Sequence, residues 1–149
     1  MPVIINEKSL PYGINKLYEI ITDVERYPEF IPWFKKIKII SCDSNLIVTD
    51  VTIEFMFIRH NYTSTTELKP PNEVDGEIIA SAIVTMVDGP FDHFITIWSL
   101  KEIDEENCLV EFKCDFSFNS ILYDKMGSVC LKSMNKKIID AFIKRVGSI

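Results

Sequence analysis

The sequence has little of what most catalytic, metal-binding and nucleic-acid-binding proteins need. It contains two histidines, His60 and His93, with no His/carboxylate spacing typical of a metal site. It also lacks a Gly-rich phosphate loop and a nucleophile elbow. Its 16 basic and 22 acidic residues give a net charge of −6, whereas a nucleic-acid binder is normally basic. We therefore expect a non-enzymatic binding protein without metal or cofactor, and we do not expect nucleic acid as a partner.

Long hydrophobic runs and paired cysteines are also missing. No window reaches the ~18 apolar residues of a membrane-spanning helix, and residues 1–10 do not have the pattern of a signal peptide. The cysteines form no CxxC pair, which favours a reduced, cytoplasmic protein. They are Cys42, Cys108, Cys114 and Cys130. Cys114 and Cys130 fall on apolar faces and are expected to be small buried side chains.

Hydrophobic residues, by contrast, are plentiful. They make up 47% of the 149 residues and include ten phenylalanines. This length and composition predict a single domain over residues 1–149, with enough apolar material for a core and for a lined cavity.

Alternating apolar and polar residues predict strands over most of the chain. Successive segments are separated by turn residues, among them Pro70-Pro71-Asn72 and the acidic run from Asp104 to Asn107. Short connections between successive strands predict an antiparallel meander. The seven expected strands are 2–10, 36–42, 46–57, 59–68, 77–87, 91–101 and 109–118.

Two short helices are expected after the first strand. Apolar residues recur at helical spacing from Ile14 to Thr22. In the block that follows, Pro28 can start a single helical turn and Pro32 ends it. This block is too aromatic for an exposed loop, so it is expected either to plug one end of the sheet or to form the entrance for an apolar ligand. Its aromatic residues are Tyr27, Phe30, Trp33 and Phe34.

A long amphipathic helix is predicted at residues 121–146. Residues 120–149 contain six Lys or Arg and two Asp, a charge of +4, which leaves −10 for the rest of the chain. The basic outer side, with Lys125, Lys132 and Lys136, is either solvated surface or an approach to an anionic membrane. The same outer side carries the apolar residues Ile139, Ile143 and Val146, which are expected either to contact the membrane or to pack on the first strand or on a partner subunit. The softer inner side is expected to face the sheet and includes Tyr123, Met126, Gly127, Cys130, Met134, Ile138 and Ala141.

An antiparallel sheet with one apolar face needs a cover, and the last helix is the only predicted element long enough to provide it. The expected fold class is therefore α+β. A seven-stranded antiparallel sheet would wrap around a long C-terminal helix, with two short helices after strand 1.

Three sequence blocks resemble the coenzyme Q-binding and ribosome-association toxin family of the START-like (polyketide cyclase/dehydrase, helix-grip) superfamily. The first is Leu10-Pro11-Tyr12 followed by Tyr18 and by Asp23-Val24-Glu25-Arg26-Tyr27-Pro28-Glu29-Phe30-Ile31-Pro32-Trp33. The second is Asp88-Gly89-Pro90-Phe91 with Trp98. The third is Val110-Glu111-Phe112 with Asp115-Phe116-Ser117-Phe118-Asn119-Ser120, continuing to Met134 and Ala141-Phe142. Two features depart from the family. Phe34 stands where many relatives have cysteine, and the stretch 74–80 is longer than expected.

The resemblance implies a helix-grip fold and a cavity for a hydrophobic ligand. The main hypothesis is a non-catalytic carrier or chaperone of ubiquinone that supports respiratory electron transport, cytoplasmic or peripheral at the inner face of the membrane. One alternative is a toxin-like protein that binds the large ribosomal subunit and blocks subunit association. A third is a cyclase-like enzyme, which would need an ionisable group inside the cavity. Only Asp23 and Asp115 are candidates for that group, and strand alternation places Asp115 outside.

The cavity and its entrance are expected to draw on the aromatic block, the inward faces of the strands and the inner side of the helix. Composition alone leaves a dry, well-packed core equally open. The expected residues are Tyr27, Phe30, Trp33, Phe55, Phe57, Phe91, Phe94, Trp98, Phe112, Phe116, Phe118, Met126, Cys130 and Met134.

Overall fold

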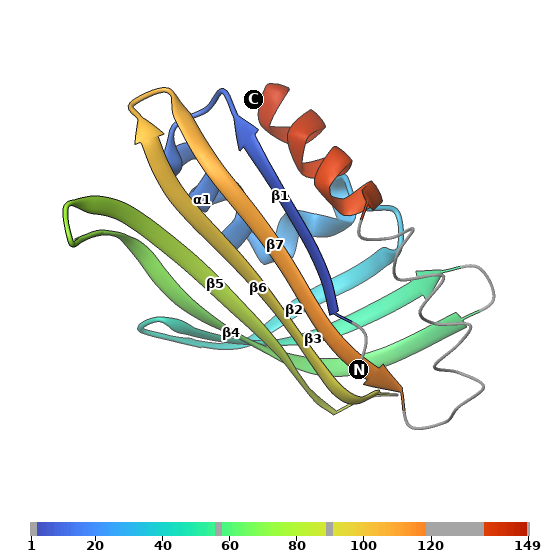
Figure 1. Ribbon diagram of the computed structural model, residues 1–149. Helices are drawn as coiled ribbons and strands as arrows, with labels where there is room; N and C mark the ends of the chain where they lie inside the picture. Colours follow the sequence, from blue (N-terminus) through green and yellow to red (C-terminus); the bar gives the residue numbers. More distant parts are fainter. Residues whose placement is uncertain (1–2, 56–57, 89–90, 119–135, 149) are drawn as a thin grey trace.

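The computed structural model describes residues 3–55, 58–88, 91–118 and 136–148 (Figure 1). A helix over residues 136–147, drawn in red in Figure 1, is named here the C-terminal helix. The other elements, in chain order, are β1 (Val3–Leu10), α1 (Ile14–Thr22), the 3₁₀-helix η1 (Val24–Glu29), β2 (Phe34–Asp43), β3 (Leu46–Phe55), β4 (Ile58–Val74), β5 (Glu77–Asp88), β6 (Phe91–Asp104) and β7 (Asn107–Phe118).

The seven strands form one antiparallel sheet in the order β1-β7-β6-β5-β4-β3-β2. Strands β2 to β7 follow one another as a meander, and β1 pairs with β7 from Val3 opposite Asp115 to Leu10 opposite Cys108. The sheet is curved, and α1 and the C-terminal helix lie on one of its faces (Figure 1). This arrangement confirms the expected antiparallel sheet covered by a terminal helix.

The alternation of side chains holds in the central strands. Trp98 and Leu100 of β6 are buried on the face covered by the helices, and Lys101 is exposed. In β7, Phe112 and Cys114 are buried on the same face. Because successive residues of a strand point to opposite faces, the period-two pattern was sufficient to assign the inner face.

The expected turn at Pro70-Pro71-Asn72 is wrong. Strand β4 continues to Val74, and the turn lies at Asp75 and Gly76, whose φ angles are 53° and 81°. Positive φ at both central residues is the requirement of the type I′ hairpin turn, which Asp-Gly satisfies. The prolines have no N–H for the ladder, and the pairing of β4 with β5 shifts register between Lys69 and Asn72 to accommodate them.

The acidic turn is confirmed, since β6 ends at Asp104 and β7 begins at Asn107. Helix α1 has the expected bounds. The second short helix is a 3₁₀-helix that begins at Val24 and ends at Glu29, with Pro28 inside it, so the expectation that Pro28 starts the turn and Pro32 ends it is wrong. Gly13 precedes α1, where an added Cβ would lie 2.9 Å from the Glu105 carbonyl oxygen, so a side chain there would collide with the backbone.

The C-terminal helix buries a different side from the one expected. Ile139, Phe142 and Val146 are 6%, 5% and 1% exposed, whereas Ile138 is only half-buried. The assignment of Ile139 and Val146 to the outer side is therefore wrong. A small hollow lined by all three buried residues also reaches Leu10 of β1, so packing on the first strand, the alternative explanation, is confirmed. The described part of the chain contains no helix long and apolar enough to cross a membrane.

Candidate functional site

An aromatic cluster joins η1, the sheet and the C-terminal helix. The ring of Phe142 lies 5.3 Å from Tyr27, 5.1 Å from Phe30 and 4.8 Å from Trp98, in edge-on geometries. The rings of Trp98 and Phe112 are 4.6 Å apart. Four residues expected at the site are thus brought together around Phe142, which the prediction did not include.

A cavity of about 110 Å³ adjoins this cluster, between the inner face of the sheet, the segment after η1 and the C-terminal helix. Five of the expected residues line it: Tyr27, Trp33, Phe94, Trp98 and Phe112. The described wall also contains Phe34, Tyr62, Val84, Thr96, Cys114 and Ile138.

The size of the cavity limits what it can hold. Pockets for drug-sized ligands usually measure roughly 300–1,000 Å³, well above the 110 Å³ found here. A hollow of this size accepts a single ring or a short piece of chain. A long isoprenoid tail would have to continue beyond it.

Three polar side chains interrupt the apolar wall. Thr96 Oγ1 donates a hydrogen bond to Cys114 Sγ over 3.8 Å. Burial raises the pKa of the Cys114 thiol to about 11, and the hydrogen bond from Thr96 only partly offsets this rise. Burial, with a smaller contribution from the nearby Cys114, also raises the pKa of Tyr62. Both groups are therefore uncharged at neutral pH, and the wall is polar at this place without carrying charge.

Tyr27 uses its hydroxyl group for the fold. The hydroxyl donates to the backbone carbonyl of Ile21 at the end of α1. Burial, and then the nearby carboxylate of Asp23, raise the pKa of Tyr27. The ring of Tyr27 lines the cavity, while its polar atom is directed to α1.

Other expected site residues lie beside the cavity or outside the described residues. Phe30 is half-buried in the aromatic cluster and does not line the described wall. Lys136 is exposed on the C-terminal helix. Strands β3, β6 and β7 contain residues whose backbone is described but whose side chains are not: Phe55, Phe91, Phe116 and Phe118. The rest lie outside the described residues: Phe57, Met126, Cys130, Met134, Lys125 and Lys132.

Sequence reasoning missed the polar part of the wall, although a signal was present. Tyr62 shares the inner side of β4 with Ser64 and Thr66, and Thr96 shares the inner side of β6 with Trp98. The alternation of the strands places these residues on the inner faces. The predicted cavity lining, however, contained mainly large apolar side chains and left these residues out. Their hydroxyl groups were the available signal.

Neither acidic candidate enters the cavity. Asp23 is exposed and forms an ion pair with Arg26 over 3.0 Å. Asp115 stands opposite Ile95 in the register of β6 and β7, on the outer face of the sheet, as the alternation predicted. The described wall of the cavity therefore holds no carboxylate and no histidine.

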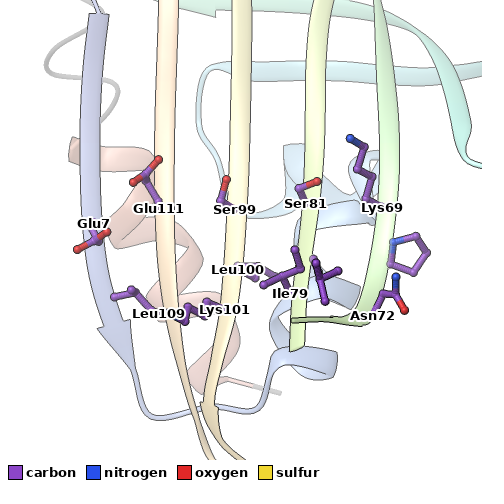
Figure 2. Close-up of a pocket in the computed structure, with 13 residues that line it drawn as sticks. Glu7, Lys69, Asn72, Ile79, Ser81, Ser99, Leu100, Lys101, Leu109 and Glu111 are labelled. Carbon is purple, nitrogen blue, oxygen red and sulfur yellow. The ribbon is translucent and has the colours of Figure 1, made fainter. Parts of the chain in front are cut away.

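A larger hollow of about 560 Å³ lies on the outer face of the sheet (Figure 2). One row crosses its floor from strand to strand, formed by Glu7, Glu111, Ser99, Ser81 and Lys69. These residues belong to β1, β7, β6, β5 and β4, and Figure 2 shows their side chains spread along this row rather than directed to one point. Such a spread of polar groups is typical of a solvated trough rather than of a site that surrounds a small ligand.

Comparison with known proteins confirms the resemblance drawn from the sequence. Residues 10–143 match the family described as "Polyketide cyclase / dehydrase and lipid transport". The chain is 26% identical over 150 residues to the Coenzyme Q-binding protein COQ10 homolog B, mitochondrial, of Xenopus laevis, covering 95% of the chain and 57% of that protein. It is 25% identical over 145 residues to the Ribosome association toxin RatA of Escherichia coli K12, covering 97% of the chain and 87% of the toxin. The chain thus spans little more than half of the coenzyme Q-binding relative.

Solved structures support the same fold. The Zhui aromatase/cyclase from Streptomyces sp. R1128 superposes with a TM-score of 0.83 at 14% identity, covering 98% of this chain and 93% of the cyclase. An 18 kDa protein from Caulobacter crescentus superposes with a TM-score of 0.72 at 25% identity, covering 99% and 97%. The antiparallel sheet with its C-terminal helix agrees with the family match over residues 10–143. The chain belongs to the polyketide cyclase / dehydrase and lipid transport family.

Proposed function

We propose that this protein binds a hydrophobic isoprenoid quinone, ubiquinone, in the cavity between the sheet and the C-terminal helix, and that it carries or chaperones the quinone without catalysis in support of respiratory electron transport. The observation that carries the proposal is the wall of that cavity. It is mainly aromatic and aliphatic, with uncharged polar groups at one place. Similarity to proteins named as coenzyme Q-binding supports the choice of ligand.

The cavity also suggests where the two parts of a quinone would lie. A ring matches its size, and the tail would leave it along apolar surface. Transfer of an isoprenoid chain out of water is favourable by roughly 25 cal/mol for each Å² buried, so the tail would supply most of the affinity. A ring in the cavity would supply specificity.

A pair of variants on one strand tests the proposal. Val84 lines the cavity, while Ile83, its neighbour in β5, belongs to the opposite face of the sheet. Val84→Phe should fill the cavity and lower the affinity for ubiquinone-2 at least about tenfold, whereas Ile83→Phe should leave it unchanged. Both tryptophans of the chain, Trp33 and Trp98, line the cavity, so quenching of their fluorescence reports binding directly.

Thermal unfolding of both variants controls for loss of the fold. Lipid extracts of the protein purified from a host that makes quinone should contain ubiquinone by mass spectrometry. The proposal fails if the parent protein neither carries nor binds ubiquinone, or if Val84→Phe binds it as well as the parent does.

Ribosome association is the second candidate, supported by the toxin relatives, of which the chain covers most of the length. The net charge of −6 disfavours direct contact with ribosomal RNA, so a ribosomal protein would be the partner. Sucrose gradients of cells that express the protein at modest levels would separate the two candidates. Loss of assembled ribosomes would support the toxin, and unchanged profiles would exclude it.

A cyclase-like activity is the weakest candidate. Its support is the likeness to an aromatase/cyclase at 14% identity, which concerns the fold alone. Proton transfer in such chemistry needs a group whose pKa lies near the working pH. The pKa values of Tyr27, Tyr62 and Cys114 on the described wall are all raised away from neutrality. These groups suit hydrogen bonding better than acid–base catalysis.

A further inference from the structure

We infer that Tyr62 is the residue that recognises the ligand's head group, donating a hydrogen bond from its hydroxyl group to a ring carbonyl oxygen. The inference rests on the proposed function and narrows it to one part of the cavity. It assigns the ligand to the quinones and related cyclic ketones rather than to apolar lipids in general.

The position of Tyr62 is fixed by the sheet. It lies on β4, opposite Val51 of β3, and its side chain belongs to the inner face with Ser64 and Thr66. Together with Val84, Thr96 and other residues, it lines the cavity. A side chain anchored in a central strand is a precise place from which to present a hydrogen bond.

Tyr62 differs from the other two residues of the described wall that carry a hydroxyl group, because those two hydroxyl groups already donate hydrogen bonds within the protein. The hydroxyl of Tyr27 donates to the Ile21 carbonyl, and that of Thr96 donates to Cys114 Sγ. The hydroxyl of Tyr62 makes no hydrogen bond to any residue that the structure describes, so among the three hydroxyl groups of the described wall it is the one left for a ligand.

The chemistry of the ligand follows from this unused donor. Tyr62 is half-buried, and a phenol in the cavity that meets only hydrocarbon loses hydrogen bonds to water, which a carbonyl oxygen of the ligand would restore. The pKa of Tyr62 is raised by burial, so the phenol keeps its proton and remains a donor at physiological pH. A site that offers a hydrogen-bond donor to its ligand binds analogues without the matching acceptor atom more weakly. The cavity could therefore bind a quinone ring in preference to a purely apolar lipid.

The test compares two probes with one tail length, ubiquinone-2 and a geranyl-substituted benzene without ring oxygens, by isothermal titration calorimetry. Tyr62→Phe should weaken ubiquinone-2 binding about tenfold and change the affinity for the benzene analogue less than about twofold. Tyr18→Phe is the matched control. It removes the same atom from a tyrosine that does not line the cavity, and it should change neither affinity.

The outcomes separate this inference from the proposed function. If the parent and Tyr62→Phe bind ubiquinone-2 equally, Tyr62 does not recognise the head group, while quinone binding itself stands. If the parent does not bind ubiquinone-2, both fail. Should Tyr62→Phe not fold, the infrared carbonyl band of ubiquinone-2 bound to the parent decides. A shift to lower wavenumber supports the inference, and an unshifted band overturns it.

Discussion

Two tyrosines near the start of the chain differ in what their hydroxyl groups contact. Tyr27 donates to the Ile21 carbonyl, whereas the buried hydroxyl oxygen of Tyr18 has no hydrogen-bond partner among the described residues. Removing the hydroxyl group of Tyr27 leaves a buried carbonyl without its donor. We expect Tyr27→Phe to lower the free energy of unfolding by about 1–3 kcal/mol in urea titrations.

Tyr18→Phe removes a polar atom that has no partner there, so it should leave the free energy of unfolding unchanged or raise it slightly. The two variants lose the same atom, and their difference therefore isolates the hydrogen bond. Equal losses of stability in both would contradict the role assigned to Tyr27.

Because the Cys114 thiol is buried, the free energy of unfolding should fall at alkaline pH. Burial raises the pKa of the Cys114 thiol from its ordinary value of 9.0 to about 11. Above pH 9 the unfolded chain loses this proton first, so the contribution to stability is present below pH 9 and falls as pH rises toward 11. From about pH 8 to about pH 10.5, Cys114 should account for a loss of about 2 kcal/mol in the free energy of unfolding.

Cys114→Ala removes this titration. Urea unfolding of parent and variant at both pH values should therefore show a shallower decline for the variant, whatever its stability at the lower pH. Parallel declines would mean that the thiol ionises alike in the folded and unfolded chains.

At the scale of secondary-structure elements, Phe142 packs the C-terminal helix against η1 and the sheet. Its ring contacts η1 through Tyr27 and Phe30 and contacts the sheet through Trp98. Phe142→Ala leaves a void where these elements meet, and we expect it to lower the free energy of unfolding by about 3–5 kcal/mol.

Lys144 provides the control on the same helix because it is exposed. Lys144→Ala should change the free energy of unfolding by less than about 0.5 kcal/mol. If the two variants unfold at the same urea concentration, the helix does not depend on its aromatic contacts.

Strand elements could be predicted from the sequence because their signal is local and repeats every second residue. Phe112 and Cys114 follow this pattern and are buried, and the acidic turn before β7 is confirmed. Helix α1 was equally clear, because its apolar residues from Ile14 onward share one side.

Other features depend on long-range contacts that a single segment does not contain. Two prolines predicted a turn at Pro70, but the bulge between β4 and β5 accommodates them and the strand continues. Ile139 and Val146 were assigned outward because a helical wheel does not show that β1 and α1 cover a second apolar side. Tyr62 was missed because its role depends on Tyr27 and Thr96 being already bonded.

For the whole molecule, the uneven charge suggests how a carrier would reach its ligand in a membrane. Each lysine near an anionic leaflet contributes roughly 1 kcal/mol of attraction. Replacing Lys125, Lys132 and Lys136 together by Glu should therefore lower binding to anionic liposomes at least about 100-fold in flotation assays.

The matched control moves the same charge change to β2. Lys35, Lys36 and Lys38 are all exposed there, and their replacement by Glu gives a protein of equal net charge. Flotation of this control should fall much less. If the variant in which Lys125, Lys132 and Lys136 are replaced floats as well as the parent, these three lysines have no part in membrane contact.

The two edges of the sheet also affect how the molecule behaves among its own copies. An edge strand offers unpaired backbone groups to which a foreign strand can add. Lys36 and Lys38 are exposed on β2, whose pairing with β3 is twice shifted, and β1 exposes Glu7 and Lys8. Charged side chains and irregular pairing discourage strand addition at both edges, which also expose Ile5 of β1 and Ile40 of β2.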